Sequence, residues 1–479
     1  MENNKFYITT TLPYVNAEPH IGFAMEIIQA DVVARYHLMK GNEVFFNTGT
    51  DEHGQKIYLK ALEAKQDPKD YCDFYATKFD DLKVALNLSY NNFIRTTDPH
   101  HIEAAQEFWK RCADNGDIYR ANYKTKYCIG CELEKQDSEL IDGRCPLHPS
   151  RELEIREEEN YFFKFSSYQD KLLKLYDDNP DFVVPSSRQK EIYNFVKEGL
   201  QDFSISRLAE KMPWGIPVPN DDKHVMYVWF DALINYVSCL GWPKDEKKFE
   251  EFWGVNESPN AIQVAGKDNL RQQSAMWQAM LFSAGLPNSK QVFIHGFINM
   301  GGQKVSKSSG IKLPSPIELV EKYSTDALRY YVLREIPSYE DGDFSEERFE
   351  ERYNSDLANS LGNLVSRVTN IAEKSEITFQ DQSLMIDIGD EIKEYKFDRA
   401  LEKIWEKIYE ANKYVDDEKP WSIKDDPEKL STVINNPLNQ IKAIGEALVP
   451  FMPETAEKII NIFKQEKITK SEPLFPKKQ

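Results

Sequence analysis

The segment KFYITTTLPYVNAEPHIG, residues 5–22, decides the fold. Residues 6–11 are aromatic and β-branched and therefore predict a strand. After a polar turn, apolar residues recur at helical spacing up to Gly41, a residue type that commonly follows the end of a helix. A strand that leads into a helix start often binds phosphate, because unpaired N–H groups and the helix dipole point at the ligand. We expect Gly22 to admit a ligand close to the backbone and His20 to contact an anion, although a histidine here is more often a cap.

The length and composition are those of an ordinary globular protein. A chain of 479 residues has room for about two or three domains. Apolar residues make up 41% of it, and no apolar run reaches the roughly 20 residues of a membrane helix. The first residues lack the regions of a signal peptide, and six cysteines do not indicate a secreted disulfide framework, so we expect a cytoplasmic location. The net charge of −19 argues against general coating of nucleic acid but leaves room for a local basic track for RNA.

Alternating strand and helix patterns predict an α/β fold with a doubly wound parallel sheet. Residues 43–48 (EVFFNT) form the second expected strand, and an acidic loop follows them. In such sheets ligands bind at the carboxyl ends of the strands. Later strands are expected at 225–230, 261–265 and 291–294. Because a turn-rich segment separates the early strands from the later ones, we expect a split Rossmann-like domain that carries an insertion.

The last third of the chain has no strand patterns. Helical periodicity at 348–373, 387–415 and 437–464 predicts a bundle, and the end of the chain is expected to be frayed or lightly docked. We therefore expect a first half of the Rossmann-like domain, an insertion, a second half of the same domain and a helical domain, at residues 1–116, 117–222, 223–344 and 345–479.

Three cysteines and a histidine have the spacing of a paired metal knuckle, Cys128-x2-Cys131 followed by Cys145-x2-His148. Three thiolates and one imidazole suit Zn²⁺ better than an iron–sulfur cluster. Four protein ligands leave no open position, so we expect one structural zinc ion that stabilises a small insert. Cysteines that cluster without binding a metal are the alternative.

A second loop with phosphate-binding character is GGQKVSKSSG, residues 301–310. It places Lys304 and Lys307 among glycines and hydroxyl side chains. It is not a Walker A loop, because Ser306 stands where that motif requires glycine. Two mobile ammonium groups suit a transient polyphosphate, whereas a flexible surface loop explains this segment equally well when it is taken alone.

Together, the HxG opening and the KxSKS loop resemble the two ATP motifs of class I aminoacyl-tRNA synthetases. The surrounding residues are similar to those of methionyl-tRNA synthetases over nearly the whole chain. The resemblance implies that L-methionine attacks ATP to give methionyl-adenylate and pyrophosphate, and that the methionyl group then passes to the 3′ end of tRNA(Met). It also implies that Mg²⁺ accompanies ATP, and it places the zinc knuckle near the acceptor end of the tRNA.

The same resemblance assigns the site residues. His20, Lys304 and Lys307 would be catalytic and would bind ATP together with Gly22, Gly266 and Asp268. Asp51 would accept the methionine ammonium group, as a carboxylate suits a buried cation. The whole expected methionine pocket consists of Leu12, Pro13, Tyr14, Asp51, Trp229, Ala232, Leu233, Tyr236 and Gln273.

Three positions depart from the family pattern. Phe23 stands where the first motif usually has a second histidine, so an apolar ring replaces a polar donor at the phosphate site. Gln273 stands where a histidine often lines the methionine pocket, and it keeps both donor and acceptor capacity. Val305 replaces the methionine of the lysine loop, an apolar exchange that we expect to be tolerated.

The resemblance places anticodon recognition in the helical domain, at Asn363, Arg367 and Trp421. Asn363 and Arg367 are four residues apart and share one helix face. A tryptophan can stack an unpaired base while amide and guanidinium groups bond to base edges. Without the resemblance, a core tryptophan and a surface arginine would be the simpler interpretation.

Two other functions remain open at this stage. One is a related class I synthetase for another amino acid, which the pocket residues disfavour. The other is a tRNA-binding paralogue impaired in catalysis, which only Phe23 favours. Because no β-rich module follows the bundle, we expect a monomer.

Overall fold

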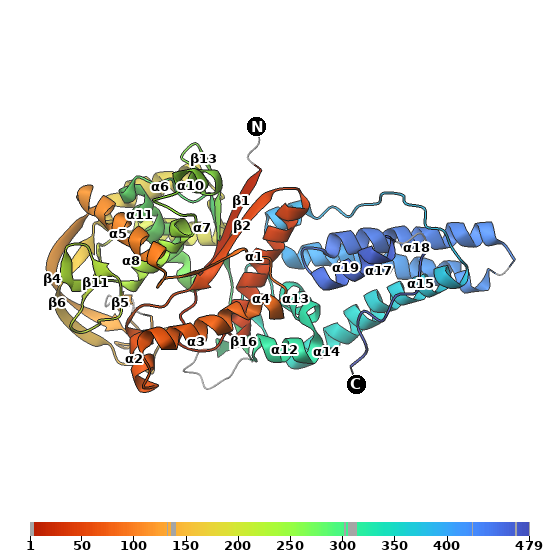
Figure 1. The fold of residues 1–479 in the computed structure, drawn as a ribbon, viewed down its shortest axis with the longest axis horizontal. Coiled ribbons are helices and arrows are strands. Elements are labelled where there is room, and N and C mark those ends of the chain that lie inside the picture. The colour runs from red at the N-terminus through yellow and green to blue at the C-terminus, as the bar shows by residue number, and fades with distance from the viewer. Residues whose placement is uncertain are drawn as a thin grey trace.

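The computed structural model describes residues 4–131, 133–135, 140–300, 303–304, 314–423, 425–464 and 467–478. Figure 1 shows an α/β body and, beside it, an elongated group of helices formed by the last part of the chain. Among the described helices, none combines the length and the apolar character that a membrane crossing needs.

A six-stranded parallel sheet organises the α/β body, in the order β3-β2-β1-β14-β15-β7. Its strands are β1 (Lys5–Thr10), β2 (Glu43–Thr50), β3 (Asn92–Arg95), β7 (Val183–Val184), β14 (Ala261–Gly266) and β15 (Gln291–His295). The two central strands, β1 and β14, are buried along almost their whole length, as expected of a sheet covered on both faces. The chain order reverses between β1 and β14, which is where doubly wound sheets bind ligands. The predicted split Rossmann-like fold is confirmed.

Helix α1 (Ile21–Met39) follows β1 and packs against β1, β2 and β14. Its first fourteen residues are largely buried, because the helix lies between the sheet and the helices that follow later in the chain. Gly41 follows its end with a φ of 81°, a left-handed conformation that favours glycine, as the sequence predicts.

The predicted strand at 225–230 is wrong. β11 (Asp221–Met226) pairs antiparallel with β9 (Ser206–Leu208) and β10 (Pro217–Val218) in a separate three-stranded sheet. Residues Val228–Leu233 form helix α8, so Trp229 comes from a helix. The cause is that a short continuous apolar run has no periodicity that separates a buried strand from a buried helix.

The segment expected as an insertion is built on a four-stranded sheet in the order β5-β4-β6-β8. Its strands are β4 (Ile118–Cys128), β5 (Leu133–Lys135), β6 (Glu154–Phe163) and β8 (Phe203–Ser204). The same segment also supplies β7, which pairs with β15 at the edge of the parallel sheet. The insertion therefore shares a sheet with its parent domain instead of standing apart from it.

Shorter elements complete the α/β body. Before the knuckle these are α2 (Gln55–Glu63), α3 (Pro68–Asp80), α4 (Leu82–Ala85) and α5 (Pro99–Asp114). After it come η2 (Phe165–Tyr168), α6 (Gln169–Asp178), α7 (Ser186–Lys197), α9 (Asn235–Ser238), α10 (Glu246–Trp253), β12 (Gly254–Val255), β13 (Ser258–Pro259), η3 (Lys267–Asn269), η4 (Gln272–Met276) and α11 (Trp277–Ala284). A small sheet, β17-β16-β18, lies beyond β15 and consists of β16 (Ile298–Met300), β17 (Gln303–Lys304) and β18 (Gly342–Asp343).

The predicted helical region is confirmed, with changed boundaries. Two helices precede it, α12 (Pro316–Tyr323) and α13 (Thr325–Arg334), and its own elements are α14 (Glu346–Arg352), η5 (Tyr353–Gly362), α15 (Asn363–Lys374), α16 (Gly389–Lys393), α17 (Phe397–Glu418), η6 (Pro420–Ser422), α18 (Pro427–Leu448) and α19 (Pro453–Ile462). The helix expected at 387–415 is broken at Tyr395, whose φ is 55°. Pro437, expected at a helix start, lies inside α18. The chain end is docked, since Ile468 and Phe475 are buried in the core.

A buried arginine joins the helices to the sheet. The guanidinium of Arg329, in α13, donates to the carbonyl oxygens of Pro450 and Phe451 at 2.9 and 2.8 Å and forms an ion pair with Asp31 of α1 at 2.7 Å. Burial alone would raise the pKa of Asp31, but Arg329 and Arg35 hold it below its ordinary value. Helix α1 of the α/β body is thereby fixed to the turn between α18 and α19.

Candidate active site and metal centre

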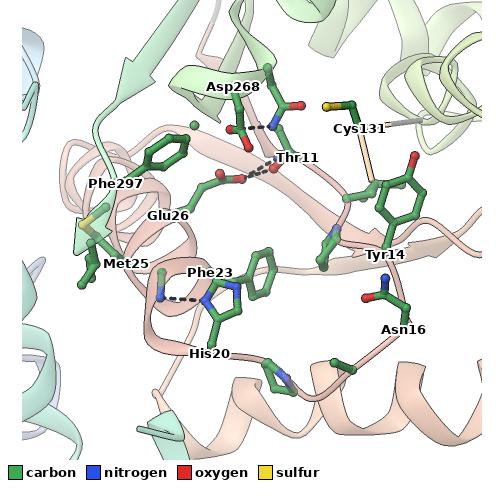
Figure 2. A pocket seen from close by; sticks show the side chains of 18 of the residues that line it. Thr11, Tyr14, Asn16, His20, Phe23, Met25, Glu26, Cys131, Asp268 and Phe297 are labelled. Carbon is green, nitrogen blue, oxygen red and sulfur yellow. Dashed lines mark hydrogen bonds between the residues drawn. The ribbon is translucent and has the colours of Figure 1, made fainter. Parts of the chain in front are cut away.

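A cavity of about 410 Å³ lies at the carboxyl ends of β1, β14 and β15, beside the start of α1 (Figure 2). It is lined by residues that the sequence analysis selected from three separate parts of the chain: Leu12, Pro13, Tyr14, His20, Gly22, Trp229, Gly266 and Asp268. The cavity lies at the point where the strand order reverses, as expected for a ligand site. Folding therefore brings residues expected to bind ATP and some of those expected to bind methionine into one pocket.

His20 caps helix α1. Its Nδ1 accepts a hydrogen bond from the backbone N–H of Gly22 at 3.1 Å, which in neutral imidazole leaves the proton on Nε2 (Figure 2). A β-carbon at Gly22 would come within 2.9 Å of the His20 ring, so a larger residue here would shift the ring from this cap. The cap and the predicted ligand contact are compatible, because the imidazole lines the pocket.

Phe23 packs into the wall of the same pocket. Its ring meets Phe79 of α3 edge to face, with centroids 5.4 Å apart. The ring therefore fills space between α1 and α3 with an apolar contact where the family pattern has an imidazole. This contact gives the substitution a packing role at the helix start.

Of the residues expected to bind methionine, Leu12, Pro13, Tyr14 and Trp229 line the cavity, whereas Asp51, Ala232, Leu233, Tyr236 and Gln273 do not. Tyr14 and Asp51 face each other across an isolated parallel bridge. Tyr236 and Gln273 are buried, and the Gln273 amide donates to the Tyr236 hydroxyl at 2.7 Å and accepts from Gln263 at 3.0 Å. Ala232, Leu233 and Asp51 are buried as well. Trp229 lines the cavity, and its indole N–H has no hydrogen-bond partner among the described residues.

The sequence analysis missed a group of polar side chains at the pocket edge. The Glu26 carboxylate accepts from the backbone N–H and the hydroxyl of Thr11, at 2.8 and 2.5 Å (Figure 2). It also lies 2.9 Å from Nε2 of His295. All three residues line the cavity. The signal that could have revealed them was the position of His295 directly after an expected strand.

The sequence analysis also missed a second group of polar side chains, which adjoins the residues expected to bind methionine. The Asp231 carboxylate of α8 accepts from Nδ1 of His53 at 2.6 Å and Nε2 of His101 at 2.8 Å, and all three side chains are buried. Burial alone would raise the pKa of Asp231, but the two imidazoles hold it below its ordinary value. This network joins α8, which carries Trp229, to the loop that carries Asp51.

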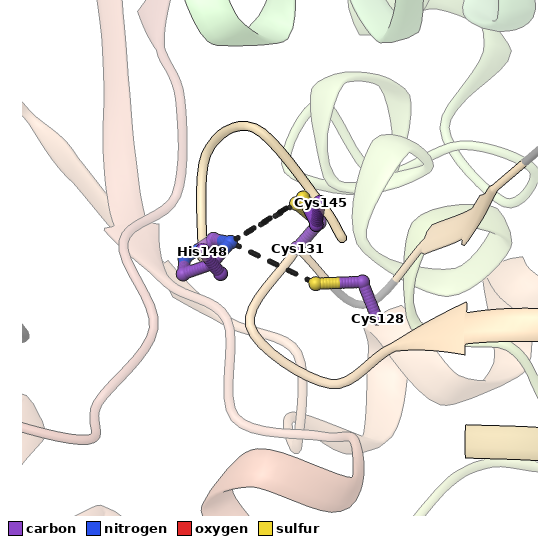
Figure 3. Close-up of side chains that lie close together, drawn as sticks. All are labelled: Cys128, Cys131, Cys145 and His148. Carbon is purple, nitrogen blue, oxygen red and sulfur yellow. Dashed lines mark hydrogen bonds between the residues drawn. The ribbon is translucent and has the colours of Figure 1, made fainter. Parts of the chain in front are cut away.

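Cys128, Cys131, Cys145 and His148 converge in one cluster (Figure 3). Nδ1 of His148 lies 3.2 Å from Sγ of Cys131 and 3.8 Å from that of Cys128, and Cys131 and Cys145 are 3.4 Å apart. Tetrahedral Zn–S and Zn–N bonds imply ligand separations of roughly 3.5 to 3.8 Å. The donor set and its spacing fit one metal ion. Cys128 and Cys131 share a hydrogen bond, which lowers the pKa of the Cys128 thiol and raises that of Cys131.

The cluster of three cysteines and His148 also borders the pocket. Cys131 and His148 line the cavity, together with Gly130 and Leu147 of the same knuckle. Lys56 of α2 reaches the Gly130 carbonyl at 3.4 Å, and its ammonium group lies 5.3 Å from the Tyr14 ring centroid. Lys56 thus links the knuckle to Tyr14, one of the residues that the sequence analysis assigned to methionine.

The lysine loop falls largely outside the described residues. Lys304 belongs to the short strand β17, of which the backbone is described, paired with Asn299 of β16. Lys307 and Val305 lie outside the part of the chain that the structure describes.

The three expected anticodon residues lie close together in the helical region. Asn363 opens α15, and Arg367 follows one turn later. The Arg367 guanidinium lies 5.5 Å from the ring centroid of Trp421, and it donates to Asp416 at 2.7 Å. Trp421 is 51% exposed, so it is not a core residue.

Comparisons with known proteins identify the family of this chain. A family model described as tRNA synthetases class I (M) matches residues 6–152 and 135–369, and one for the anticodon binding domain of methionyl tRNA ligase matches 372–474. The methionine–tRNA ligase of Thermotoga maritima is 42% identical over 95% of this chain and 74% of its own length. That of a Nostoc species is 42% identical over 96% and 89%.

Solved structures give the same result. A Mycobacterium tuberculosis methionyl-tRNA synthetase in complex with methionyl-adenylate is similar with a TM-score of 0.89, at 34% identity, over 99% of both chains. The apo form of that synthetase gives a TM-score of 0.82 at 31% identity, over 99% of this chain and 98% of the other. The chain therefore belongs to the class I methionyl-tRNA synthetases, the ATP-dependent ligases that join methionine to its tRNA.

Proposed function

We propose that the cavity between β1 and β14 binds ATP and methionine side by side and is where methionyl-adenylate forms. The supporting observation is the convergence of His20 and Gly22, at the start of α1, with Gly266 and Asp268, at the end of β14, around one space. A related synthetase, 34% identical, has been solved in complex with methionyl-adenylate. In this proposal His20 and Gly22 contact the phosphates and Asp268 accepts from the ribose hydroxyls.

The reaction requires positioning and charge neutralisation. A carboxylate oxygen of methionine attacks the α-phosphorus, the bond to the oxygen that bridges to the β-phosphate breaks, and pyrophosphate leaves. A ribose hydroxyl of the tRNA end then attacks the methionyl carbonyl carbon and AMP leaves. Lys304 and Lys307 would stabilise the charge that develops on pyrophosphate. Mg²⁺ bound to ATP would supply further neutralisation of the phosphates.

We assign the amino-acid side to the wall between Tyr14 and Tyr236. Asp51 would accept the ammonium group, and the aromatic rings of Tyr14 and Trp229 would contact the thioether. The indole N–H of Trp229 has no hydrogen-bond partner among the described residues, and in this proposal it would donate to the ligand. Leu12, Pro13, Ala232, Leu233 and Gln273 would complete the pocket.

The finer assignments of metal and tRNA contacts follow from the same proposal. The Cys128, Cys131, Cys145 and His148 cluster would hold one structural Zn²⁺, because its four ligands leave no position for a substrate. Asn363, Arg367 and Trp421 would read the anticodon of tRNA(Met). We also propose that the enzyme is a cytoplasmic monomer, with catalytic, insertion, catalytic and anticodon segments at 1–116, 117–222, 223–344 and 345–479.

Methionine-dependent exchange of pyrophosphate into ATP tests this proposal, run with each of the amino acids in turn. Exchange with methionine alone supports it, whereas exchange with another amino acid would assign the chain to a related synthetase. Binding of tRNA without any exchange would assign it to an impaired paralogue, and recovery in Phe23→His would then identify the cause. Lys307→Ala should slow exchange far more than it weakens methionine binding, while Lys247→Ala, at an exposed lysine of α10, should change neither.

A further inference from the structure

His295 is held by acceptors on both of its ring nitrogens. Nδ1 lies 2.6 Å from the carbonyl oxygen of Gly296, and Nε2 lies 2.9 Å from a carboxylate oxygen of Glu26. A carbonyl oxygen accepts only, so Nδ1 carries a proton. If Nε2 had none, its lone pair would face the lone pairs of the carboxylate. The geometry therefore requires a proton between Nε2 and Glu26.

The charges around the ring place that proton on the imidazole. Glu26 approaches from α1, Asp268 lies on the η3 side, and the Gly296 carbonyl faces the ring from the strand end. Burial alone would lower the pKa of His295, but Glu26, with smaller effects of the Gly296 carbonyl and Asp268, raises it above its ordinary value. The other oxygen of Glu26 accepts two hydrogen bonds from Thr11, as expected of an ionised carboxylate.

This ion pair lies where the nucleotide site is assembled. Glu26, His295 and Gly296 line the cavity, and a β-carbon at Gly266 would meet Asp268 at 2.9 Å and the His295 ring at 3.5 Å. The pair ties the end of β15 to α1 and, through Thr11, to the end of β1. An unneutralised Glu26 at this place would oppose the approach of an anionic phosphate chain.

We propose that His295, as an imidazolium, is a positioning residue for ATP: it neutralises Glu26 at the pocket edge and holds β15, α1 and β1 in register around the nucleotide. Loss of its proton separates the pair and weakens ATP binding, while methionine binding is kept. The inference rests on the proposed function, because it requires ATP in this cavity.

The test is pyrophosphate exchange from about pH 6 to about pH 10, with KM determined separately for ATP and methionine. In the wild type, KM for ATP should rise about tenfold on the alkaline side, as His295 loses its proton. Glu26→Gln should remove this rise, because the amide donates to a neutral imidazole and still accepts from Thr11. His295→Asn should keep the donor to Gly296 but lose the tie to Glu26, and should raise KM for ATP about tenfold at every pH.

Control variants separate this inference from other causes. His224→Asn changes a buried histidine of β11, outside the cavity, and should keep the wild-type pH profile. Titration of the substrates is the same in every variant, so the pH profile of KM for methionine should be the same in the wild type and all variants. Melting curves check that each variant folds. If the wild type catalyses exchange but KM for ATP still rises at alkaline pH in Glu26→Gln, the inference is overturned and the proposed function stands. A wild type without exchange would overturn the proposed function as well.

Discussion

The buried carboxylate of Asp231 gives a direct prediction about the methionine side. Asp231→Ala leaves the N–H groups of His53 and His101 without their acceptor in the core. A buried donor left unsatisfied costs about 1–3 kcal/mol, so we expect the free energy of unfolding to fall by about 2–6 kcal/mol. Asp231→Asn keeps one acceptor and nearly the same shape, so its cost should be about half as large.

The functional effect should be selective. Asp231 lies between Trp229 and Ala232 on α8, and its partner His53 follows the Asp51 loop. Asp231→Asn should therefore raise KM for methionine about tenfold and change KM for ATP much less, since Gly266 and Asp268 belong to β14 and the turn after it.

Urea unfolding and pyrophosphate exchange measure the two effects. Asp114→Asn, at an exposed aspartate of the helix that carries His101, is the matched control and should change stability by less than about 0.5 kcal/mol. An alanine variant as stable as the control, or an asparagine variant that raises both KM values alike, would refute the reasoning.

Other predictions concern the metal, the domain junction and the anticodon. Cys145→Ser should lower bound zinc measured by elemental analysis and expose the knuckle to protease; full zinc content would contradict the ligand set. Arg329→Met should cost about 3–5 kcal/mol in urea unfolding, because it leaves the buried Asp31 with Arg35 alone and removes the donor to the carbonyl oxygens of Pro450 and Phe451. Because the pKa of Asp31 is lowered in the folded protein, the Arg329–Asp31 pair stabilises the fold above about pH 4, and this stabilisation is lost as the pH falls. The free energy of unfolding of Arg329→Met should therefore fall less with acidification than that of the wild type. Trp421→Ala should slow tRNA charging at least tenfold yet leave pyrophosphate exchange unchanged, whereas equal loss in both would exclude an anticodon role.

The sequence predicts those parts of the fold that local patterns determine. The strand–turn–helix at residues 5–41 could be recognised because β-branched residues, a glycine and an apolar period follow one another in order. Residues 225–230 could not, because an apolar run alone is compatible with both a buried strand and a buried helix. Whether that run extends the sheet or packs on it depends on tertiary contacts of α8.

The candidate site shows the same division. Knuckle spacing is a local signal, so the three cysteines and the histidine that cluster in the fold could be named in advance. Glu26 and His295 are 269 residues apart, and nothing local indicates that the two share a proton. His53, His101 and Asp231 likewise come from three elements that only the folded sheet brings together.

A crystal structure with a non-hydrolysable methionyl-adenylate analogue tests the central claim most directly. We predict the analogue in the cavity between α1 and β14, with its ammonium group at Asp51 and its ribose at Asp268. An analogue bound outside this cavity, in a protein that still activates methionine, would contradict the assignment of the site.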